Sequence, residues 1–277
     1  DLCAREGIAF VLGHALYMKA IHGAKAKSDR IDSEKIAVLV RGGLMPVAYA
    51  YPADMRATRD LMRRRLLFVR QRGSLLAHIQ ITHHLYNVVP PGKRITYRSN
   101  REGLGEGFED SSVRHSIAAD LALADHYEVT IGELELAVLR QARIHDPNAL
   151  ALLTSVPGIG KVLALTILYE IHDISRFPSV RDFASYSRLV KCERTSAGKS
   201  LGTGGNKIGN AYLKWAFSEA AVLFIAKSEQ GRTVLNRLER KYGKPKALSV
   251  LAHKLGRAVY YMLARKQAFD PQRFATS

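Results

Sequence analysis

Two long stretches of helical sequence, joined by a segment rich in turns, constrain the fold of this chain more than any other feature. From about Ala53 to Asn87, leucine, isoleucine and valine recur at helical spacing among many arginines. A second stretch, roughly Ser111 to His145, carries far more aspartate and glutamate. The prolines and glycines of residues 90–107 interrupt the pattern between them. We therefore predict a long antiparallel hairpin of two helices.

After this hairpin the sequence changes to short helical segments separated by Gly, Pro and Ser turns. Asp146-Pro147 ends the second long helix, and we place a domain boundary near Pro147. Three further helices are expected near the end of the chain, at residues 211–226, 232–241 and 245–267. The pattern predicts a carboxy-terminal domain built from helices.

The amino-terminal segment predicts a β-strand that feeds a helix. Residues 1–6 resemble the end of a helix, and residues 7–12 form a short apolar run opened by glycine, which is typical of a buried strand. Ser28 is expected to cap a helix that continues until Gly42 and Gly43. Because the chain opens on Asp1 without an initiator Met or a signal-like region, we interpret its start as a truncation.

The excess of basic residues indicates the class of partner. The chain of 277 residues carries 42 Lys and Arg against 25 Asp and Glu, a formal net charge of +17, which predicts a polyanionic partner. Hydrophobic residues make up 47% of the chain, enough for ordinary cores. Cys3 and Cys192 lack metal-ligand spacing, so we expect a reduced, cytoplasmic protein without structural zinc. Charges and turns interrupt the apolar stretches, and we expect no membrane span.

The first segment that could carry chemistry is residues 27–32. Asp29 and Asp32 stand at i and i+3 on one face of a helix, where two carboxylates suit a hard divalent cation such as Mg²⁺. The same residues would also favour the positive end of the helix dipole, and spacing alone favours this second interpretation. Two carboxylates make only half of a two-metal site.

The second segment is residues 156–161, Val-Pro-Gly-Ile-Gly-Lys, between apolar helical stretches. It resembles the turn of a helix-hairpin-helix module, in which Gly158 and Gly160 let the backbone approach a phosphate and the amides of the next helix donate to its oxygens. Lys161 adds a positive charge. A structural turn between two core helices is the alternative interpretation.

The third segment, residues 194–210, combines hydroxyls and glycines with the cations Arg194, Lys199 and Lys207. Such a loop suits a pocket for a reactive phosphodiester, although a flexible basic loop without catalysis would have the same composition. It is not a Walker A loop, because Glu193 stands where the first glycine of that motif belongs.

In this order, the three segments resemble the DEDD-type insertion-sequence transposases, the IS one-ten family, which are relatives of the Piv DNA invertases. Residues 27–37 are similar to the motif that holds the last two acidic residues of a RuvC-like, ribonuclease-H-fold nuclease domain. Residues 153–170, with 176–179 and 196–199, are similar to the family's carboxy-terminal transposase domain. The resemblance covers nearly the whole chain, although residues 53–145 support it only as a helical connecting arm.

The resemblance implies a mainly α fold in three parts. Residues 1–50 would be the carboxy-terminal part of a RuvC-like nuclease domain, an α/β remnant; residues 51–147 a coiled-coil-like helical arm; and residues 148–277 an all-helical transposase domain with the helix-hairpin-helix. It also implies a homo-oligomer on DNA, and some members of the family use a structured guide RNA. Phosphate contacts of the arm, through Arg63 and Arg64, would suit either nucleic acid.

The resemblance further implies the chemistry. Asp29 and Asp32 would be ligands of Mg²⁺, which offsets charge on phosphoryl oxygens, and Ser196 would attack DNA to form a phosphoserine link. Ser200 is the competing nucleophile in the same loop, and Thr195 is a poorer one. The expected function is a DNA transposase or recombinase, of which this chain would be an incomplete and inactive fragment.

Two departures from the family pattern bear on this expectation. The family's first Asp and its Glu would lie upstream of every residue present, so half of the metal site is expected to be missing. Residues 187–191 read Ser-Arg-Leu-Val-Lys where many relatives have a Gly-Leu-Val-Pro-like turn. Two other functions remain open: a non-catalytic helix-hairpin-helix DNA-binding protein, and a metal-dependent nuclease without strand transfer.

Overall fold

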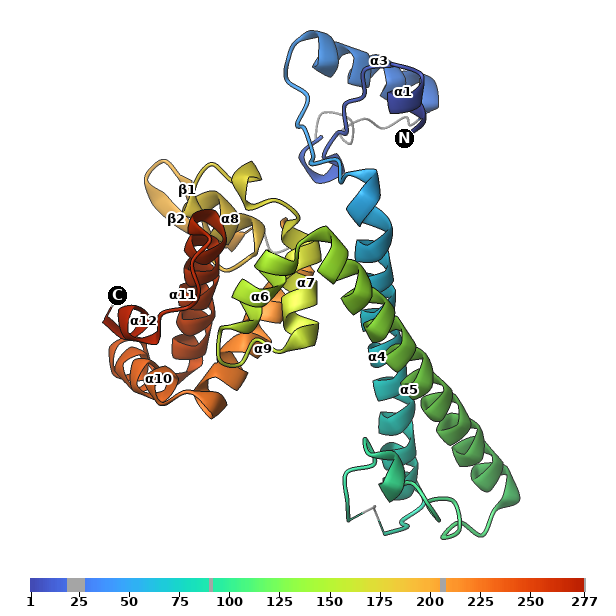
Figure 1. Cartoon of the computed structure of the whole chain (residues 1–277). Helices are drawn as coiled ribbons and strands as arrows, with labels where there is room; N and C mark the ends of the chain where they lie inside the picture. The colour runs from blue at the N-terminus through green and yellow to red at the C-terminus, as the bar shows by residue number, and fades with distance from the viewer. Residues whose placement is uncertain (19–27, 90–91, 205–207, 277) are drawn as a thin grey trace. The chain divides into compact units, whose positions relative to one another are not determined.

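The computed structural model describes residues 1–18, 28–89, 92–204 and 208–276, and its elements are mainly helical (Figure 1). They divide into two compact units. The first unit comprises residues 1–56 and 192–208, and the second comprises residues 57–191 and 209–277. The predicted class, mainly α, is confirmed at this level.

The described amino-terminal residues of the first unit form three short helical elements: α1 (Leu2–Arg5), η1 (Ala15–Tyr17) and α3 (Asp29–Arg41). The predicted cap of α3 is present, because the Ser28 hydroxyl accepts a hydrogen bond from the Ile31 amide at 3.3 Å. The helix ends at Gly42, and Gly43 follows in the left-handed region with φ of 66°. Both ends of this helix are therefore confirmed, each at the residue type that sets it.

The buried strand predicted at residues 7–12 does not form in the described structure. The β pairing here is an isolated antiparallel bridge between Gly13, just after the segment, and Val47, and the Ala48 amide donates to the Leu12 carbonyl oxygen at 2.7 Å. A strand of a buried sheet needs continuous backbone pairing, which one bridge does not supply. Its apolar side chains are mostly exposed: Ile8 by 59%, Phe10 by 61% and Val11 by 51%. The RuvC-like fold of this part stays a prediction.

Residues 192–204 form a separate antiparallel hairpin of β1 (Cys192–Ser196) and β2 (Lys199–Gly204). Ala197 and Gly198 make its two-residue turn, with φ of 49° and 74°, the left-handed region that such tight turns require. The all-helical prediction for residues 148–277 is therefore wrong at this segment. Its content of Ser, Thr and Gly predicts a loop, whereas the backbone pairs across the turn.

The helical arm consists of α4 (Ala53–Leu85) and α5 (Ser111–His145), which run side by side in Figure 1. Arg65 Nε lies 2.8 Å from Glu135 Oε1, and Arg72 NH1 lies 3.5 Å from Glu128 Oε2. The partner of the later arginine comes earlier in α5, so the two helices are antiparallel, as predicted.

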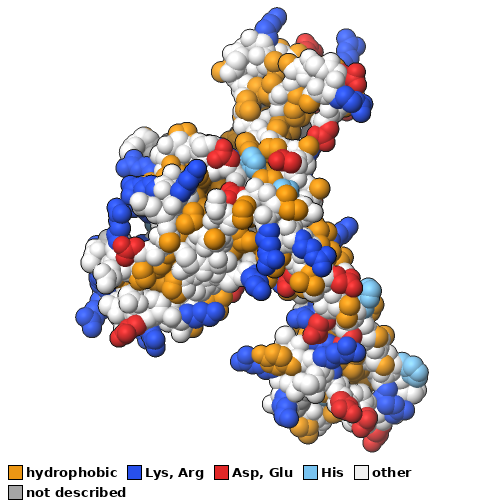
Figure 2. Space-filling model, in the orientation of Figure 1, with side chains coloured by type: hydrophobic (Ala, Val, Ile, Leu, Met, Phe, Trp, Pro, Cys, Tyr) orange, Lys and Arg blue, Asp and Glu red, His pale blue; other side chains and the backbone are white. Residues whose placement is uncertain are grey.

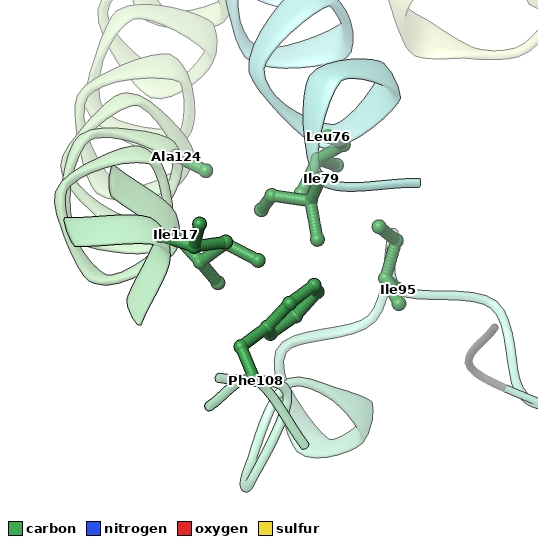
Figure 3. Close-up of a cluster of buried hydrophobic side chains, with 7 residues drawn as sticks. Leu76, Ile79, Ile95, Phe108, Ile117 and Ala124 are labelled. Atoms are coloured by element: carbon green, nitrogen blue, oxygen red, sulfur yellow. The ribbon is translucent and has the colours of Figure 1, made fainter. Parts of the chain in front are cut away.

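A hydrophobic cluster closes the far end of the arm (Figure 3). Its buried side chains come from both helices and from the segment between them: Leu76, Ile79, Ile95, Phe108, Val113, Ile117 and Ala124. Arg101, only 5% exposed, holds that segment from within. Its guanidinium donates to the carbonyl oxygens of Ile95 and Thr96 and to Glu128 Oε2, each at 2.8 Å. Residues 92–110, which include η2 (Arg98–Asn100), thus fold into a compact cap.

The carboxy-terminal domain packs short helices around α7 (Lys161–Ile171), in which residues 163–171 are all buried. The other elements are α6 (Pro147–Thr154), η3 (Ile174–Arg176), α8 (Val180–Tyr186), α9 (Ala211–Lys227), α10 (Glu229–Tyr242), α11 (Lys244–Arg265) and α12 (Pro271–Thr276). Side-chain caps begin α6 at Asp146, α8 at Ser179, α9 at Asn210 and α10 at Ser228. No described helix combines the length and the hydropathy that a membrane span requires.

Candidate functional site

The hairpin turn brings the predicted nucleophile next to a cation. Ser196 and Lys199 are directly opposite each other across the turn, and Thr195 faces Ser200 one step further along. Side chains of opposed residues lie on the same side of a hairpin, and those of successive residues on opposite sides. Ser196 therefore shares a face with the Lys199 ammonium, whereas Thr195 and Ser200 share the other face. All four residues are exposed.

The structure says less of the other two cations predicted for this segment. Arg194 belongs to β1, but its side chain lies outside the described residues. Lys207 lies outside them altogether. In the part of the hairpin that the structure describes, Lys199 is the cation paired with Ser196 in the backbone register.

Asp29 and Asp32 occupy the first turn of α3, with Asp29 exposed and Asp32 half-buried. Their oxygens are the ligands that Mg²⁺ prefers. Among the described residues, however, no group of three or more His, Cys, Asp or Glu side chains is placed to hold a metal ion. The pair fits the donor chemistry of a magnesium site without completing one, and it also fits the helix-dipole role.

The turn between α6 and α7 uses its two predicted glycines differently. Gly158 is buried, with φ of 94°, and a Cβ there would lie 2.5 Å from the Phe224 amide nitrogen and 2.8 Å from the Leu223 carbonyl carbon. Glycine is needed at this position because α9 packs directly against the backbone. The structure thus gives Gly158 a packing role, and its predicted close approach to phosphate stays a prediction.

Gly160 and Lys161 lie at the open side of the same turn. Gly160 is exposed, a Cβ added there would meet no atom within 4 Å, and the residue caps α7 without a side chain. The start of α7, whose first amides lack partners within the helix, therefore lies at the surface together with the exposed Lys161. Amides at a helix start and an adjacent cation together suit a phosphate group.

The predicted pair of DNA-binding arginines on α4 separates into two roles. Arg63 donates to both carboxylate oxygens of Glu170, from Nε at 2.6 Å and from NH2 at 2.8 Å. This bidentate pair gives Arg63 a structural role, and its predicted contact with DNA stays a prediction. Arg64 is exposed, and its guanidinium carbon lies 5.7 Å from the centre of the Phe68 ring. The Arg64 side chain is thus open to solvent, whereas that of Arg63 is held by Glu170.

The sequence patterns do not single out Glu170, which joins the arm to the carboxy-terminal domain. Glu170 is 2% exposed, and besides Arg63 it accepts from Arg59 Nε at 3.2 Å and from Asn210 Nδ2 at 2.7 Å. Burial alone would raise the pKa of Glu170, but the hydrogen bond from Arg63 and the charges of Arg59 and Arg63 outweigh it and lower the net pKa. One sequence signal could have identified Glu170: it is an acidic residue inside the apolar run 163–171, and a buried carboxylate needs partners.

Asn210 extends this connection to the point where the chain returns from the hairpin. Its Oδ1 accepts from the amides of Tyr212 at 2.9 Å and Leu213 at 3.0 Å, which caps α9. The backbone amide of Asn210 donates to the Tyr186 carbonyl oxygen at 2.6 Å. Gly209 has φ of 88°, and a Cβ there would lie 2.6 Å from the same oxygen. The arm, α7, α8 and the start of α9 therefore share one buried anchor.

Residues 150–236 match the family model described as Transposase IS116/IS110/IS902 family. The match includes the α6–α7 turn, the hairpin with Ser196 and Lys199, and Asn210.

Three relatives extend the similarity beyond this segment. The y4qE protein of Sinorhizobium fredii is 25% identical over 248 residues, which cover 88% of this chain and 60% of that protein. The transposase for insertion sequence element IS1111A of Coxiella burnetii is 22% identical over 253 residues, which cover 88% of this chain and 68% of that protein. The transposase for insertion sequence element IS1328 of Yersinia enterocolitica is 28% identical over 156 residues, which cover 53% of this chain and 46% of that protein. The chain thus spans 60% of the length of y4qE, and the similarity includes the arm.

Proposed function

Because this chain belongs to the IS116/IS110/IS902 family of transposases, we propose that it takes part in cutting and joining DNA during the movement of an insertion sequence. The observation that carries the proposal is the cross-turn pair of Ser196 and Lys199, which lies inside the segment that matches the family. The net charge of +17 supports a polyanionic substrate.

Ser196 is the proposed nucleophile. Its Oγ attacks the phosphorus of a DNA phosphodiester, a new Oγ–P bond forms, and the P–O bond to a deoxyribose oxygen breaks. The hydroxyl proton of the serine passes to solvent, and the leaving deoxyribose oxygen takes up a proton. The phosphoserine link keeps the energy of the broken bond, so attack by another DNA hydroxyl can rejoin the strand. The Lys199 ammonium on the same face stabilises charge on the phosphoryl oxygens.

Asp29 and Asp32 are proposed as two ligands of Mg²⁺. The support is their donor chemistry and their place on one face of α3. When bound, such an ion would offset negative charge on the phosphate. Because the described residues supply this pair and no third neighbouring ligand, the reaction above is written for Ser196 and Lys199 alone.

DNA would be held by contacts that do not depend on its sequence. The exposed end of α7 offers amides and Lys161 to one phosphate, and Arg64 on α4 offers a guanidinium to another. From the resemblance to the family, we also propose that the protein acts on DNA as a homo-oligomer and that it uses a structured guide RNA.

Covalent trapping tests the proposal. The protein encoded by the complete reading frame is incubated with Mg²⁺ and labelled DNA that carries the ends of its insertion sequence. Denaturing electrophoresis should reveal a protein–DNA adduct that Ser196→Ala abolishes. Ser200→Ala is the matched control, because Ser200 belongs to the same hairpin but faces the other side, and it should leave the adduct near the wild-type level.

Two other outcomes would favour the competing functions. Metal-dependent cleavage without any adduct would favour a nuclease that uses water as its nucleophile. DNA binding with neither cleavage nor adduct would favour a non-catalytic DNA-binding protein.

A further inference from the structure

A cavity of about 940 Å³ lies between α10, α11 and α12, away from every residue assigned above. Six cationic side chains line it: Arg237, Lys241, Lys254, Arg257, Arg265 and Arg273. Among the described residues that line it, Asp270 is the one carboxylate. In Figure 2, lysine and arginine side chains are dispersed over the visible surface of this domain among hydrophobic and acidic ones. The charge of the cavity predicts an anionic occupant.

The cations of the cavity crowd one another. Burial and the nearby charges of Arg237 and Arg257 lower the pKa of Lys254, and burial with Arg257 lowers that of His253. The Asp270 carboxylate serves the backbone, because its Oδ1 accepts from the amide of Gln272 at 2.9 Å and that of Arg273 at 3.0 Å. A bound anion would relieve this repulsion, and the protein supplies little negative charge of its own to do so.

Aromatic rings stand among these cations. The Arg265 guanidinium carbon lies 4.8 Å from the centre of the Tyr261 ring, and Lys241 Nζ lies 5.3 Å from that of Tyr242. Both tyrosines are more than a third exposed, Tyr261 by 37% and Tyr242 by 43%. Exposed rings offer a stacking surface for a planar base, while cations beside them bind the phosphate that follows.

We propose that this cavity binds an unpaired nucleotide of a single-stranded nucleic acid. A duplex keeps its bases stacked inside and presents phosphates to a protein surface, so bringing one of its bases into a concave site costs unpairing and unstacking energy that an unpaired strand does not require. The volume suits a ligand of nucleotide size, with room for part of its neighbour. Single-stranded DNA and RNA share this chemistry. The proposal goes beyond the cleavage function and does not involve Ser196 or the carboxylates of α3.

The test is fluorescence anisotropy of the full chain with labelled strands of about 15 nucleotides. Oligothymidylate, oligouridylate and a DNA duplex of equal length distinguish the sources. Arg257→Ala and Tyr261→Leu should each weaken binding of at least one single strand by about tenfold, while duplex binding changes by less than about twofold. Arg240→Ala is the matched control, because Arg240 is an exposed arginine of α10 that does not line the cavity.

Three results would overturn the proposal. Equal losses on single strands and duplex would show a phosphate surface without a base site. Arg257→Ala no weaker than Arg240→Ala would remove the cavity from binding. Tyr261→Leu with unchanged affinity would remove stacking. Each variant alters an exposed side chain, and thermal melting at the wild-type temperature confirms its fold. Ser196→Ala should bind single strands normally, so failure of the catalytic proposal leaves this one intact.

Discussion

Replacing Glu170 with alanine should lower the free energy of unfolding by about 3–5 kcal/mol, the range for breaking a buried ion pair by removing one partner. The structure places this pair in that class. Glu170 is 2% exposed, and the side chains of Arg59 and Arg63 are 15% and 31% exposed. Alanine would take the carboxylate away from both guanidinium groups, where water can replace it only in part. Asn210 would also lose its hydrogen bond of 2.7 Å.

Urea denaturation measures this loss, followed by far-ultraviolet circular dichroism and by the fluorescence of Trp215, the single tryptophan. Glu170→Gln keeps the shape without the charge, and we expect a smaller loss of about 1–3 kcal/mol. Arg98→Ala is the exposed control, because the Arg98 side chain is 68% exposed in its pair with Asp125. It should cost less than about 1 kcal/mol. Equal losses for Glu170→Ala and Arg98→Ala would refute the reasoning.

The same carboxylate has a signature in pH. Because the folded protein holds the pKa of Glu170 below its ordinary value of 4.5, the ionised form stabilises the fold above that value. This contribution is lost as pH falls through the folded pKa. Glu170→Gln should therefore lack part of the acid-induced loss of stability. If Glu170→Gln loses as much stability at acid pH as the wild-type protein, another group is responsible for that loss.

Three further predictions concern single residues. Gly158→Ala should lower the free energy of unfolding by about 2 kcal/mol or more, from its positive φ and its contact with α9, whereas Gly160→Ala should change it by less than about 0.5 kcal/mol; equal losses in urea denaturation would contradict the packing role. Because burial and Arg257 lower the pKa of His253 from 6.5, stability should fall as pH drops below that value. In His253→Gln, the melting temperature should depend less on pH in that range. Lys199→Ala should slow adduct formation about 100-fold and Lys199→Arg much less, and equal rates would exclude a role for the charge.

Local sequence signals were sufficient for the helices of the arm. The structure has α5 at Ser111–His145, the bounds that the pattern predicts, and ends α4 at Leu85 near the predicted Asn87. The ends of α3 were predictable for a similar reason, since its Ser28 cap and its Gly42 stop act within a few residues of themselves. The resemblance to the family is confirmed as well, by the match of residues 150–236 to its model and by the transposases to which the chain is similar.

The features that the sequence did not predict depend on distant partners. Arg63 and Glu170 are separated by 107 positions, so no local pattern reports that Arg63 has a carboxylate partner. The apolar run 7–12 satisfies the pattern of a buried strand. A strand also needs neighbouring strands to pair with, and the β pairing described here is one isolated bridge, at Gly13. The hairpin turn places Ala197 in the left-handed region. Glycine, asparagine or aspartate at this position would have predicted the turn more clearly.

The roles of the candidate catalytic residues come from resemblance rather than from spacing. Asp29 and Asp32 share a helix face in the structure, yet that placement also suits the helix dipole. Ser196 gained a physical distinction from Ser200 only when the register of the hairpin was known, because the register decides which hydroxyl stands beside Lys199. These roles stay predictions.

The most direct test of the central proposal is to locate the covalent bond itself. Trypsin cleaves after Arg194 and Lys199, so it should release residues 195–199 as one peptide that contains Ser196 but not Ser200. After nuclease digestion of the trapped adduct, mass spectrometry should find a nucleotide phosphate on this peptide, and fragment ions should assign it to Ser196 rather than Thr195. A nucleotide on the peptide that begins at Ser200, or on any other residue, would contradict Ser196 as the nucleophile.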